Sequence, residues 1–463
     1  MLRIFRHYVS ISLVWLMIIE VLIFSAAAYL GIEIRFLEAD GWRASVEPVY
    51  EKAIVFCIIM MFSLTAVGLH SRRHLFNFNE ISIRVFLGFV IGFVGMTLAF
   101  YVSPGLYVGR GAFGLSMIIA FVAIYITRIA YQKIDDHDIF RRRFLVLGAG
   151  SKAKLVEHEE EYFVRQGVDV VGYVSIDRNA PQVSANKVLD INTSLFDLAE
   201  EHDVDEIVLA MDDRRKGFPI DGLLECKMKG IIVRDLVDFL ERLRGHIELE
   251  ALHPSVMILS DGFTSAVTPR IEKRVFDIVV SLLILLVASP IIILTSSIIW
   301  LSSFGRDPVF YRQTRIGLSD IPFQVMKFRS MRTDAEKDGA QFAKKRDSRV
   351  TLVGSFIRKT RIDELPQLLN VLKGEMSFVG PRPERPEFVL GYEQSIPHYK
   401  LRHTVKPGIT GWAQICYPYG ETDEDTKNKL QYDLYYIKNY SLFLDLTIIL
   451  QTIQVVLFGQ GAR

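Results

Sequence analysis

Two adjacent carboxylates, Asp363 and Glu364, open the segment of this sequence that is best suited to chemistry. Asp363 is a suitable N-cap for a helix that begins with Glu364, and Pro366 falls in the first turn, where its missing N–H costs nothing. The pattern predicts that this helix ends at Gly374. Free N–H groups and the helix dipole at such a start favour a phosphate ligand and the ionised form of Asp363.

The two carboxylates are expected to do different jobs. Neighbouring helical residues point about 100° apart, so Asp363 and Glu364 cannot form one bidentate clamp. One carboxylate could attack phosphorus while the other helps to hold a divalent metal, and hard oxygen ligands suit Mg²⁺. Asp363 and Glu364 are therefore the candidate metal ligands. For the pair alone, an acidic first turn without a catalytic role is the alternative interpretation.

Basic residues on both sides of the pair are suited to phosphate binding. Arg382 lies between Pro381 and Pro383, whose fixed φ angles present the guanidinium from a stiff segment. The run PFQVMKFRSM predicts a strand, in which the period of two places Lys327 and Arg329 on one face.

Two further regions could contact an anionic or nucleotide ligand. Residues 306–361 contain fourteen Lys and Arg against six Asp and Glu, although the net charge of the whole chain is only +1. This patch could be a solvated surface, attract anionic lipid headgroups or bind a polyphosphate. In the run KPGITGWAQ, Gly408 and Gly411 allow a close backbone approach to a ligand.

These motifs resemble the bacterial sugar transferases known as monotopic phosphoglycosyl transferases. The runs KRVFDIVVS, YRQTRIG, KFRSM, RIDELPQLLNVLKGEMSFVGPRP and TVKPGITGWAQI carry the resemblance in the expected order, over about residues 270–463. The whole chain is similar to the longer members of the family, which add an N-terminal membrane bundle and a Rossmann-like domain.

The resemblance implies transfer of hexose 1-phosphate from a UDP-sugar to undecaprenyl phosphate, with release of UMP and a covalent intermediate on Asp363. It also implies Mg²⁺, ping-pong kinetics, a role in exopolysaccharide, capsule or O-antigen assembly, and glucose or galactose rather than an acetamido sugar. The expected catalytic residues are Asp363, Glu364, Lys327 and Arg382, and the expected substrate-binding residues are Arg329, Arg315, Arg361, Pro381, Pro383, Gly408 and Thr410.

Four apolar runs predict a four-helix transmembrane domain over residues 1–135. The runs cover residues 8–32, 53–69, 85–102 and 112–129, and each approaches the roughly 20 residues that cross a bilayer. Basic residues concentrate on the side of the N-terminus, which places that side in the cytoplasm. The first run is long and lacks a small-residue cleavage pattern, which argues against a cleavable signal peptide. We expect a multi-pass protein of the bacterial inner membrane with a cytoplasmic catalytic domain.

A fifth apolar run, residues 275–304, is interrupted by Ser289 and Pro290. An ordinary crossing would carry the catalytic region away from cytosolic UDP-sugar, so we expect a re-entrant helix that breaks at these two residues and returns to the same face. A proline-kinked spanning helix is the alternative. A last, shorter run over residues 442–458 contains Asp445 and is expected to lie in the membrane plane or to pack against the domain.

Residues 140–255 alternate in the βαβ manner, which predicts a Rossmann-like cytosolic domain. Gly148 and Gly150 could admit a dinucleotide pyrophosphate, with Asp177 as a ribose partner, but a tight turn without ligand explains the glycines equally well. His403 is expected to be hydrogen-bonded or interfacial rather than catalytic.

The expected fold class is therefore a membrane protein of α plus α/β type with a C-terminal catalytic domain over residues 270–463. Expected partners are a UDP-hexose, undecaprenyl phosphate, membrane lipids and a second copy of the chain, but not nucleic acid. Two other functions remain open. A nucleotide-sugar dehydratase or epimerase would work on the Rossmann-like domain, although no YxxxK pair occurs there. A non-catalytic scaffold for polysaccharide assembly would use the acidic pair only as a helix cap.

Overall fold

The computed structural model divides the chain into two compact units, residues 1–131 with 261–463 and residues 132–260. The structure describes residues 2–4, 7–9, 11–36, 48–70, 78–135, 141–165, 167–176, 181–190, 194–213, 217–252, 262–263, 267–335, 347–418, 420 and 422–457.

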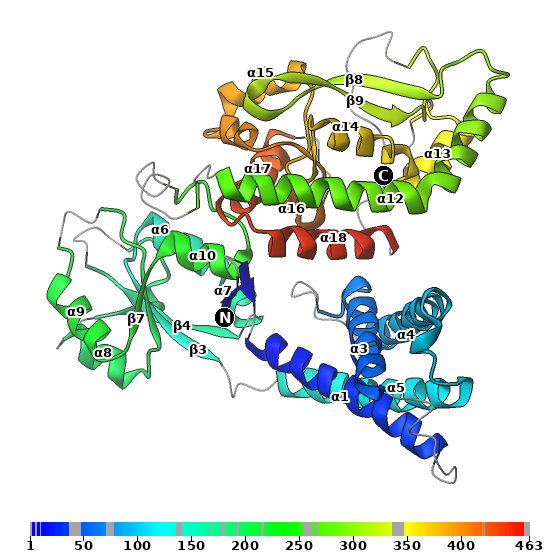
Figure 1. Cartoon of the computed structure of the whole chain (residues 1–463). Helices are drawn as coiled ribbons and strands as arrows, with labels where there is room; N and C mark the ends of the chain where they lie inside the picture. The colour runs from blue at the N-terminus through cyan, green and yellow to red at the C-terminus, as the bar shows by residue number, and fades with distance from the viewer. Residues whose placement is uncertain are drawn as a thin grey trace. The chain divides into compact units, whose positions relative to one another are not determined.

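The N-terminal part of the first unit is a bundle of apolar helices (Figure 1). After the short antiparallel pair β1 (Leu2–Ile4) and β2 (His7–Val9), it contains α1 (Ile11–Arg35), α3 (Val49–Ala66), α4 (Phe78–Val102), η1 (Pro104–Leu106) and α5 (Arg110–Asp135). The rings of Phe24, Phe56 and Phe89 pack together in its core. These helices confirm the four apolar runs as helical.

The second unit is a five-stranded parallel sheet with helices around it (Figure 1). Its strand order is β5-β4-β3-β6-β7, which confirms the predicted Rossmann-like topology. Its elements are β3 (Arg142–Leu147), α6 (Ser151–Glu157), α7 (Glu160–Arg165), β4 (Val168–Val174), η3 (Ala185–Lys187), β5 (Val188–Leu189), α8 (Leu195–Glu201), β6 (Glu206–Leu209), α9 (Ile220–Met228), β7 (Ile232–Asp235) and α10 (Leu236–Arg244).

The C-terminal part of the first unit combines one long helix with two small sheets and several short helices. Strands β8 and β9 form an antiparallel hairpin, whereas β10 and β11 pair in parallel. The elements are α12 (Val267–Ser302), β8 (Phe310–Ile316), η4 (Leu318–Asp320), β9 (Pro322–Phe328), α13 (Leu352–Lys359), η5 (Ile362–Glu364), α14 (Gln367–Lys373), β10 (Ser377–Val379), α15 (Pro386–Ser395), η6 (Tyr399–Thr404), β11 (Gly408–Thr410), α16 (Trp412–Cys416), α17 (Asp423–Lys438) and α18 (Leu442–Leu457).

Helix α12 is one continuous helix with Pro290 inside it, and its ribbon changes direction towards its C-terminal end (Figure 1). Ser289 Oγ donates a hydrogen bond of 2.8 Å to the carbonyl of Leu286, the group that Pro290 leaves without its usual helical partner. The local device predicted from Ser289 and Pro290 is thus present. Whether α12 re-enters or crosses a membrane stays a prediction.

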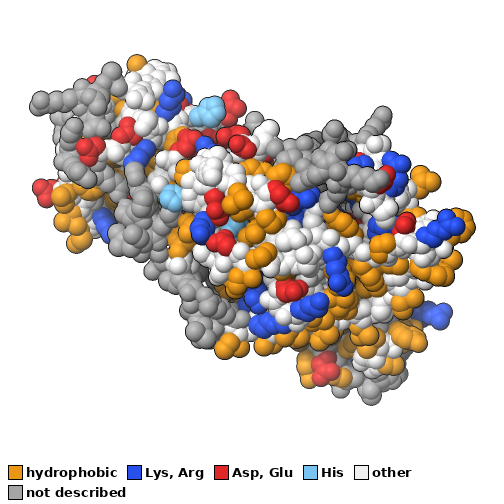
Figure 2. Space-filling view, turned by 90° about the horizontal axis from the view of Figure 1, so that it is seen from above, with side chains coloured by type: hydrophobic (Ala, Val, Ile, Leu, Met, Phe, Trp, Pro, Cys, Tyr) orange, Lys and Arg blue, Asp and Glu red, His pale blue; other side chains and the backbone are white. Residues whose placement is uncertain are grey.

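Five described helices, the four of the bundle and α12, are long and apolar enough to cross a membrane by length and composition. Only 17% of the most apolar window of α12 is buried in the protein, the smallest share of the five. Figure 2 shows that hydrophobic side chains also gather among Lys and Arg on the face seen there. Large apolar surfaces without protein cover are expected in lipid, so these helices support a membrane protein.

Polar contacts fix the start of α12 against the short elements around it. Asp277 accepts hydrogen bonds from the backbone N–H of Phe378 and the hydroxyl of Ser377, both at 3.1 Å. Lys273 Nζ lies 3.2 Å from the Asp277 carboxylate and 2.7 Å from that of Asp445 in α18. Asp445 is fully buried, so α18 packs into the domain through its charged residue.

Candidate active site

Asp363 and Glu364 lie in the one-turn helix η5, immediately before α14. The prediction that Asp363 caps the following helix is wrong, because α14 begins at Gln367 and its N-cap position is Pro366. Arg361 adopts a left-handed conformation (φ 59°), which reverses the chain so that η5 forms a separate turn. The predicted end of the helix at Gly374 (φ 89°) is confirmed.

Three cations converge on one oxygen of Glu364. Lys327 Nζ and Arg382 Nη2 both lie 3.1 Å from Glu364 Oε1, and Arg361 Nη1 lies 3.8 Å from the same atom. Lys327 comes from β9 and Arg382 from the loop after β10, so elements distant in sequence meet at this carboxylate. The structure therefore brings together four of the residues named from the sequence.

The fold gives the two carboxylates opposite electrostatic environments, although both side chains are buried. Burial alone would raise the pKa of Glu364, but the three cations hold it well below its ordinary value. Burial, followed by the charge of Glu364, raises the pKa of Asp363 to about 6. The helix-dipole argument for a readily ionised Asp363 therefore fails, because burial and Glu364 outweigh it.

Asp363 differs from Glu364 in its contacts as well. Among the described residues, no Lys, Arg or His forms an ion pair with the Asp363 carboxylate. The charges of Lys327 and Arg361, and to a smaller extent that of Arg358 in α13, act to lower the pKa of Asp363, and the sequence argument did not single out Arg358. Its place in the basic run SFIRKTR was the available signal. Glu364 is thus the carboxylate held by cations, whereas the Asp363 carboxylate has no ion-pair partner among the described residues.

The oxygens around this pair fit a hard divalent cation. The ion pairs of Glu364 all reach Oε1, so Oε2 and the Asp363 carboxylate are the oxygens that could hold Mg²⁺. Substrate phosphates usually complete the ligand set of such an ion. The metal role of Asp363 and Glu364 stays a prediction.

The loop that carries Arg382 is held through its backbone carbonyl groups, which accept hydrogen bonds from other segments. The carbonyl of Pro381 accepts a hydrogen bond of 2.9 Å from the N–H of Gly408, and the carbonyl of Pro383 accepts one of 3.1 Å from Arg315 Nη1. A Cβ at Gly408 would lie 2.1 Å from the backbone nitrogen of Gly380. The close backbone approach at Gly408 is therefore made to this chain's own β10 strand and loop, and its predicted contact with a substrate stays untested.

Two other predicted substrate residues have partners within the protein. Arg329 forms an ion pair with Asp307, and Thr410 is buried with its hydroxyl 2.7 Å from that of Thr452 in α18. Neither contact joins these residues to Glu364. Their role in substrate binding stays a prediction.

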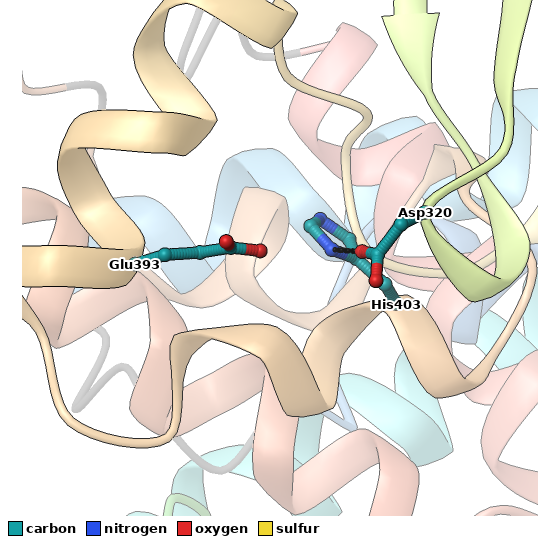
Figure 3. A group of neighbouring side chains, drawn as sticks. All are labelled: Asp320, Glu393 and His403. Carbon is teal, nitrogen blue, oxygen red and sulfur yellow. Dashed lines mark hydrogen bonds and ion pairs between the residues drawn. The ribbon is translucent and has the colours of Figure 1, made fainter.

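Asp320, Glu393 and His403 form a second group whose potential ligand atoms lie within 4.8 Å of one another (Figure 3). His403 Nδ1 lies 2.6 Å from Asp320 Oδ1, which confirms that His403 is hydrogen-bonded. Lys400 Nζ lies 3.2 Å from the other oxygen of Asp320. Because a lysine already neutralises this carboxylate, the group is better described as a polar link between the β8–β9 turn and η6.

The glycine loop of the second unit is occupied by a side chain of the protein. The Asp212 carboxylate accepts hydrogen bonds from the backbone N–H groups of Ser151 (2.8 Å) and Lys152 (3.0 Å), at the start of α6. A Cβ at Gly150 would lie 2.1 Å from Asp212 Oδ2. Asp212 thus satisfies backbone N–H groups that a pyrophosphate would otherwise use, and cofactor binding at Gly148 and Gly150 stays a prediction. Asp177 lies outside the described residues.

Long apolar helices joined to a buried acid pair with converging cations define a membrane-associated protein with a site suited to phosphate esters. The profile of the bacterial sugar transferase family matches residues 268–459. A UDP-glucose:undecaprenyl-phosphate glucose-1-phosphate transferase of Xanthomonas campestris pv. campestris is 33% identical over 368 residues, which cover 76% of this chain and 75% of the relative. The chain belongs to the bacterial sugar transferase family.

Other relatives match over shorter regions. A UDP-N-acetylgalactosamine-undecaprenyl-phosphate N-acetylgalactosaminephosphotransferase of Aeromonas hydrophila is 44% identical, with 52% of this chain and 56% of the relative covered. A UDP-glucose:undecaprenyl-phosphate glucose-1-phosphate transferase of Escherichia coli K12 is 45% identical, with 45% of each chain covered. The aligned regions thus span about half the length of these two relatives.

Proposed function

We propose that this protein transfers hexose 1-phosphate from a UDP-sugar to undecaprenyl phosphate, releasing UMP, through a covalent intermediate on Asp363. The observation that carries the proposal is the difference in ion pairing between two adjacent carboxylates. Three cations hold Glu364, whereas Asp363 forms no ion pair among the described residues. A nucleophile must keep an oxygen free for attack, and Asp363 meets that requirement.

In the first half-reaction, an oxygen of Asp363 attacks the β-phosphorus of the UDP-sugar. The bond from this phosphorus to the oxygen that bridges it to UMP breaks, and UMP leaves with the electron pair. Lys327 and Arg382 stabilise negative charge on the phosphoryl oxygens, since positioning and electrostatics dominate such transfers. When bound, Mg²⁺ would neutralise phosphate charge beside Asp363 and Glu364 Oε2.

In the second half-reaction, a phosphate oxygen of undecaprenyl phosphate attacks the same phosphorus. The bond between phosphorus and the Asp363 oxygen breaks, which restores the carboxylate and gives the diphosphate-linked sugar lipid. The donor and the acceptor use one site in turn, so the kinetics are ping-pong.

The acceptor is a lipid and the donor is a cytosolic metabolite, so the site must open at the cytoplasmic surface of the bacterial inner membrane. A re-entrant α12 would meet this need, because both of its ends then lie on the catalytic side. The hydrogen bond from Ser289 to the carbonyl of Leu286, next to Pro290, supports a bend inside lipid, where a freed carbonyl needs a partner.

The sugar and the pathway form the finer part of the proposal. The relatives described above are named for glucose and for N-acetylgalactosamine, so their names support a hexose donor without favouring one. We place the product in the assembly of exopolysaccharide, capsule or O-antigen, and we propose that the chain works as a homodimer.

The test is to trap the intermediate on purified protein with a panel of β-³²P-labelled UDP-sugars: glucose, galactose and N-acetylgalactosamine. We expect one donor to label the wild type without lipid, hydroxylamine to release the label, and undecaprenyl phosphate to discharge it. Asp363→Asn should take no label. Glu225→Gln is the control, because it alters an exposed carboxylate of α9 in the other unit.

Labelling of Asp363→Asn at the level of the wild type would overturn the nucleophile. Lipid-dependent UMP release also separates the alternatives. A non-catalytic scaffold releases no UMP, and a dehydratase or epimerase alters the sugar while leaving the UDP intact.

A further inference from the structure

We propose that Arg402 is the positioning residue for Arg382, holding the loop on which Arg382 reaches Glu364 and the substrate phosphate. The inference rests on the proposed function and assigns a role in it to a residue outside the site. Arg402 lies in η6 and its side chain is buried. It makes no ion pair with Glu364, so it acts through Arg382.

The guanidinium of Arg402 joins three groups. Nη2 donates a hydrogen bond of 2.8 Å to the backbone carbonyl of Arg382 and lies 3.1 Å from the carboxylate of Asp433. Nη1 donates a hydrogen bond of 2.6 Å to the hydroxyl of Tyr399. The planar guanidinium offers several donors at fixed angles, which an ammonium group does not. Arg402 therefore ties the loop to α17 through one rigid group.

The hydrogen bond to the carbonyl of Arg382 matters for the conformation of the loop because prolines lie on both sides of Arg382. Pro381 and Pro383 have φ angles fixed by their rings, so the orientation of the peptide between Arg382 and Pro383 depends chiefly on ψ of Arg382. The hydrogen bond from Arg402 holds that peptide in one orientation. The carbonyls of Pro381 and Pro383 are bound as well, by Gly408 and Arg315. Each carbonyl of the Pro-Arg-Pro segment thus has its own donor.

The contact with Arg402 matters because Arg382 is only partly enclosed. The Arg382 side chain is 34% exposed, yet Nη2 lies 3.1 Å from Glu364 Oε1. A long, half-exposed side chain loses considerable rotational freedom when it is held in one place, so a fixed backbone lowers the entropy that remains to be lost. Without Arg402 we expect the guanidinium of Arg382 to sample positions away from the reacting phosphate.

A purely structural role is the competing explanation, because Arg402 and Asp433 form a buried ion pair whose loss would destabilise any protein. Two variants separate the roles. Arg402→Lys keeps the charge beside Asp433 but loses the planar bridge. Arg402→Met combined with Asp433→Leu removes both charges together, a change that often leaves the free energy of unfolding unchanged or raises it. Arg242→Lys is the matched control, since Arg242 and its partner Glu206 are as buried as Arg402 and Asp433 (7% and 3% exposed in both pairs).

The experiment is a double-mutant cycle on UMP release with Arg382→Ala as the second change. Arg402→Lys should lower kcat about 10- to 100-fold, the range for a misplaced catalytic group, with KM for the UDP-sugar nearly unchanged. In the Arg382→Ala background the same change should lower kcat less than about twofold, because nothing is left to position. The Met and Leu pair should reproduce the loss of kcat, and Arg242→Lys should keep the wild-type kcat.

A readout without catalysis keeps this role separate from the proposed function. Hydrogen exchange of the segment 378–386 should speed up in Arg402→Lys, whereas that of β3 (Arg142–Leu147) should not change. Failure of the wild type to release UMP would overturn the proposed function, and the exchange result would still decide whether Arg402 holds the loop. Equal losses of kcat with and without Arg382, unchanged exchange, or unfolding of both Arg402 variants would overturn the positioning role.

Discussion

Lys327 Nζ lies 3.1 Å from Glu364 Oε1, so the lysine of a β-hairpin neutralises the second carboxylate of a one-turn helix 37 residues further along the chain. Burial lowers the pKa of Lys327 and the charge of Glu364 opposes that shift. Each charge of this buried pair therefore depends on the other. The pair leaves Asp363 as the carboxylate without an ion-pair partner among the described residues.

Replacing Lys327 tests this dependence. Lys327→Gln should lower kcat/KM for the UDP-sugar about 10²- to 10³-fold, the usual effect of losing one stabilising group at a reacting oxyanion. The acid limb set by Asp363 should move to higher pH at the same time, because Lys327 acts to lower the pKa of Asp363. Steady-state UMP release and its pH profile measure both effects, and Lys229→Gln in the other unit is the control. A kcat/KM within twofold of the wild type would contradict the role given to Lys327.

The raised pKa of Asp363 predicts an acid limit to activity. Below about pH 6 the carboxylate holds a proton and cannot attack phosphorus, so kcat/KM should fall about tenfold per pH unit. Above about pH 6 the carboxylate is ionised and the rate should level off. The pH profile of kcat/KM for the donor, which reports the free enzyme, measures this limb. A bound divalent cation favours the ionised carboxylate and should move this acid limb to lower pH. An acid limb whose position does not change with the Mg²⁺ concentration would therefore count against metal binding at Asp363.

Pro290 and the hydrogen bond from Ser289 to the carbonyl of Leu286 predict the topology of α12. In a variant without Cys57, Cys226 and Cys416, single cysteines placed at Glu272 and Ser302 should both react with an impermeant thiol reagent from the cytoplasmic side. Pro290→Ala restores the missing N–H, and we expect the helix to straighten and the reactivity at position 302 from that side to fall. Reaction of the two positions from opposite sides of inverted membrane vesicles would show that α12 crosses.

The carboxylate of Asp212 at the start of α6 predicts the behaviour of the Rossmann-like unit. Asp212→Ala should lower the stability of that unit by about 1 kcal/mol, because backbone N–H groups lose their capping acceptor. UMP release should be unchanged. Thermal unfolding followed by calorimetry measures the first effect. Titration of the wild type with NAD⁺ or NADP⁺ should give no binding, and a measurable affinity would revive the cofactor site at Gly148 and Gly150.

Local sequence was sufficient for most of the elements and for a list of candidate reacting groups. Apolar runs long enough for a bilayer predicted the helices of the bundle, and the alternation of short strands and helices predicted the parallel sheet. The segment that runs from Asp363 to Arg382 was recognised from its residue types. Such patterns are readable because periodicity, turns and prolines act over a few neighbouring residues.

The tertiary structure decided what those residues do for one another. It placed Asp363 in a turn ahead of α14, reversed the expected direction of its pKa shift, and gave Glu364 the cations from β9 and from the loop after β10. It also brought Arg402 into hydrogen-bond contact with the carbonyl of Arg382, and Asp212 into contact with the backbone N–H of Ser151 after the glycine loop. The sequence by itself determined most of the elements and the list of charged groups, whereas burial and pairing followed from folding. A pKa or an ion pair depends on distances between segments that are far apart along the chain, and only the packed fold sets those distances.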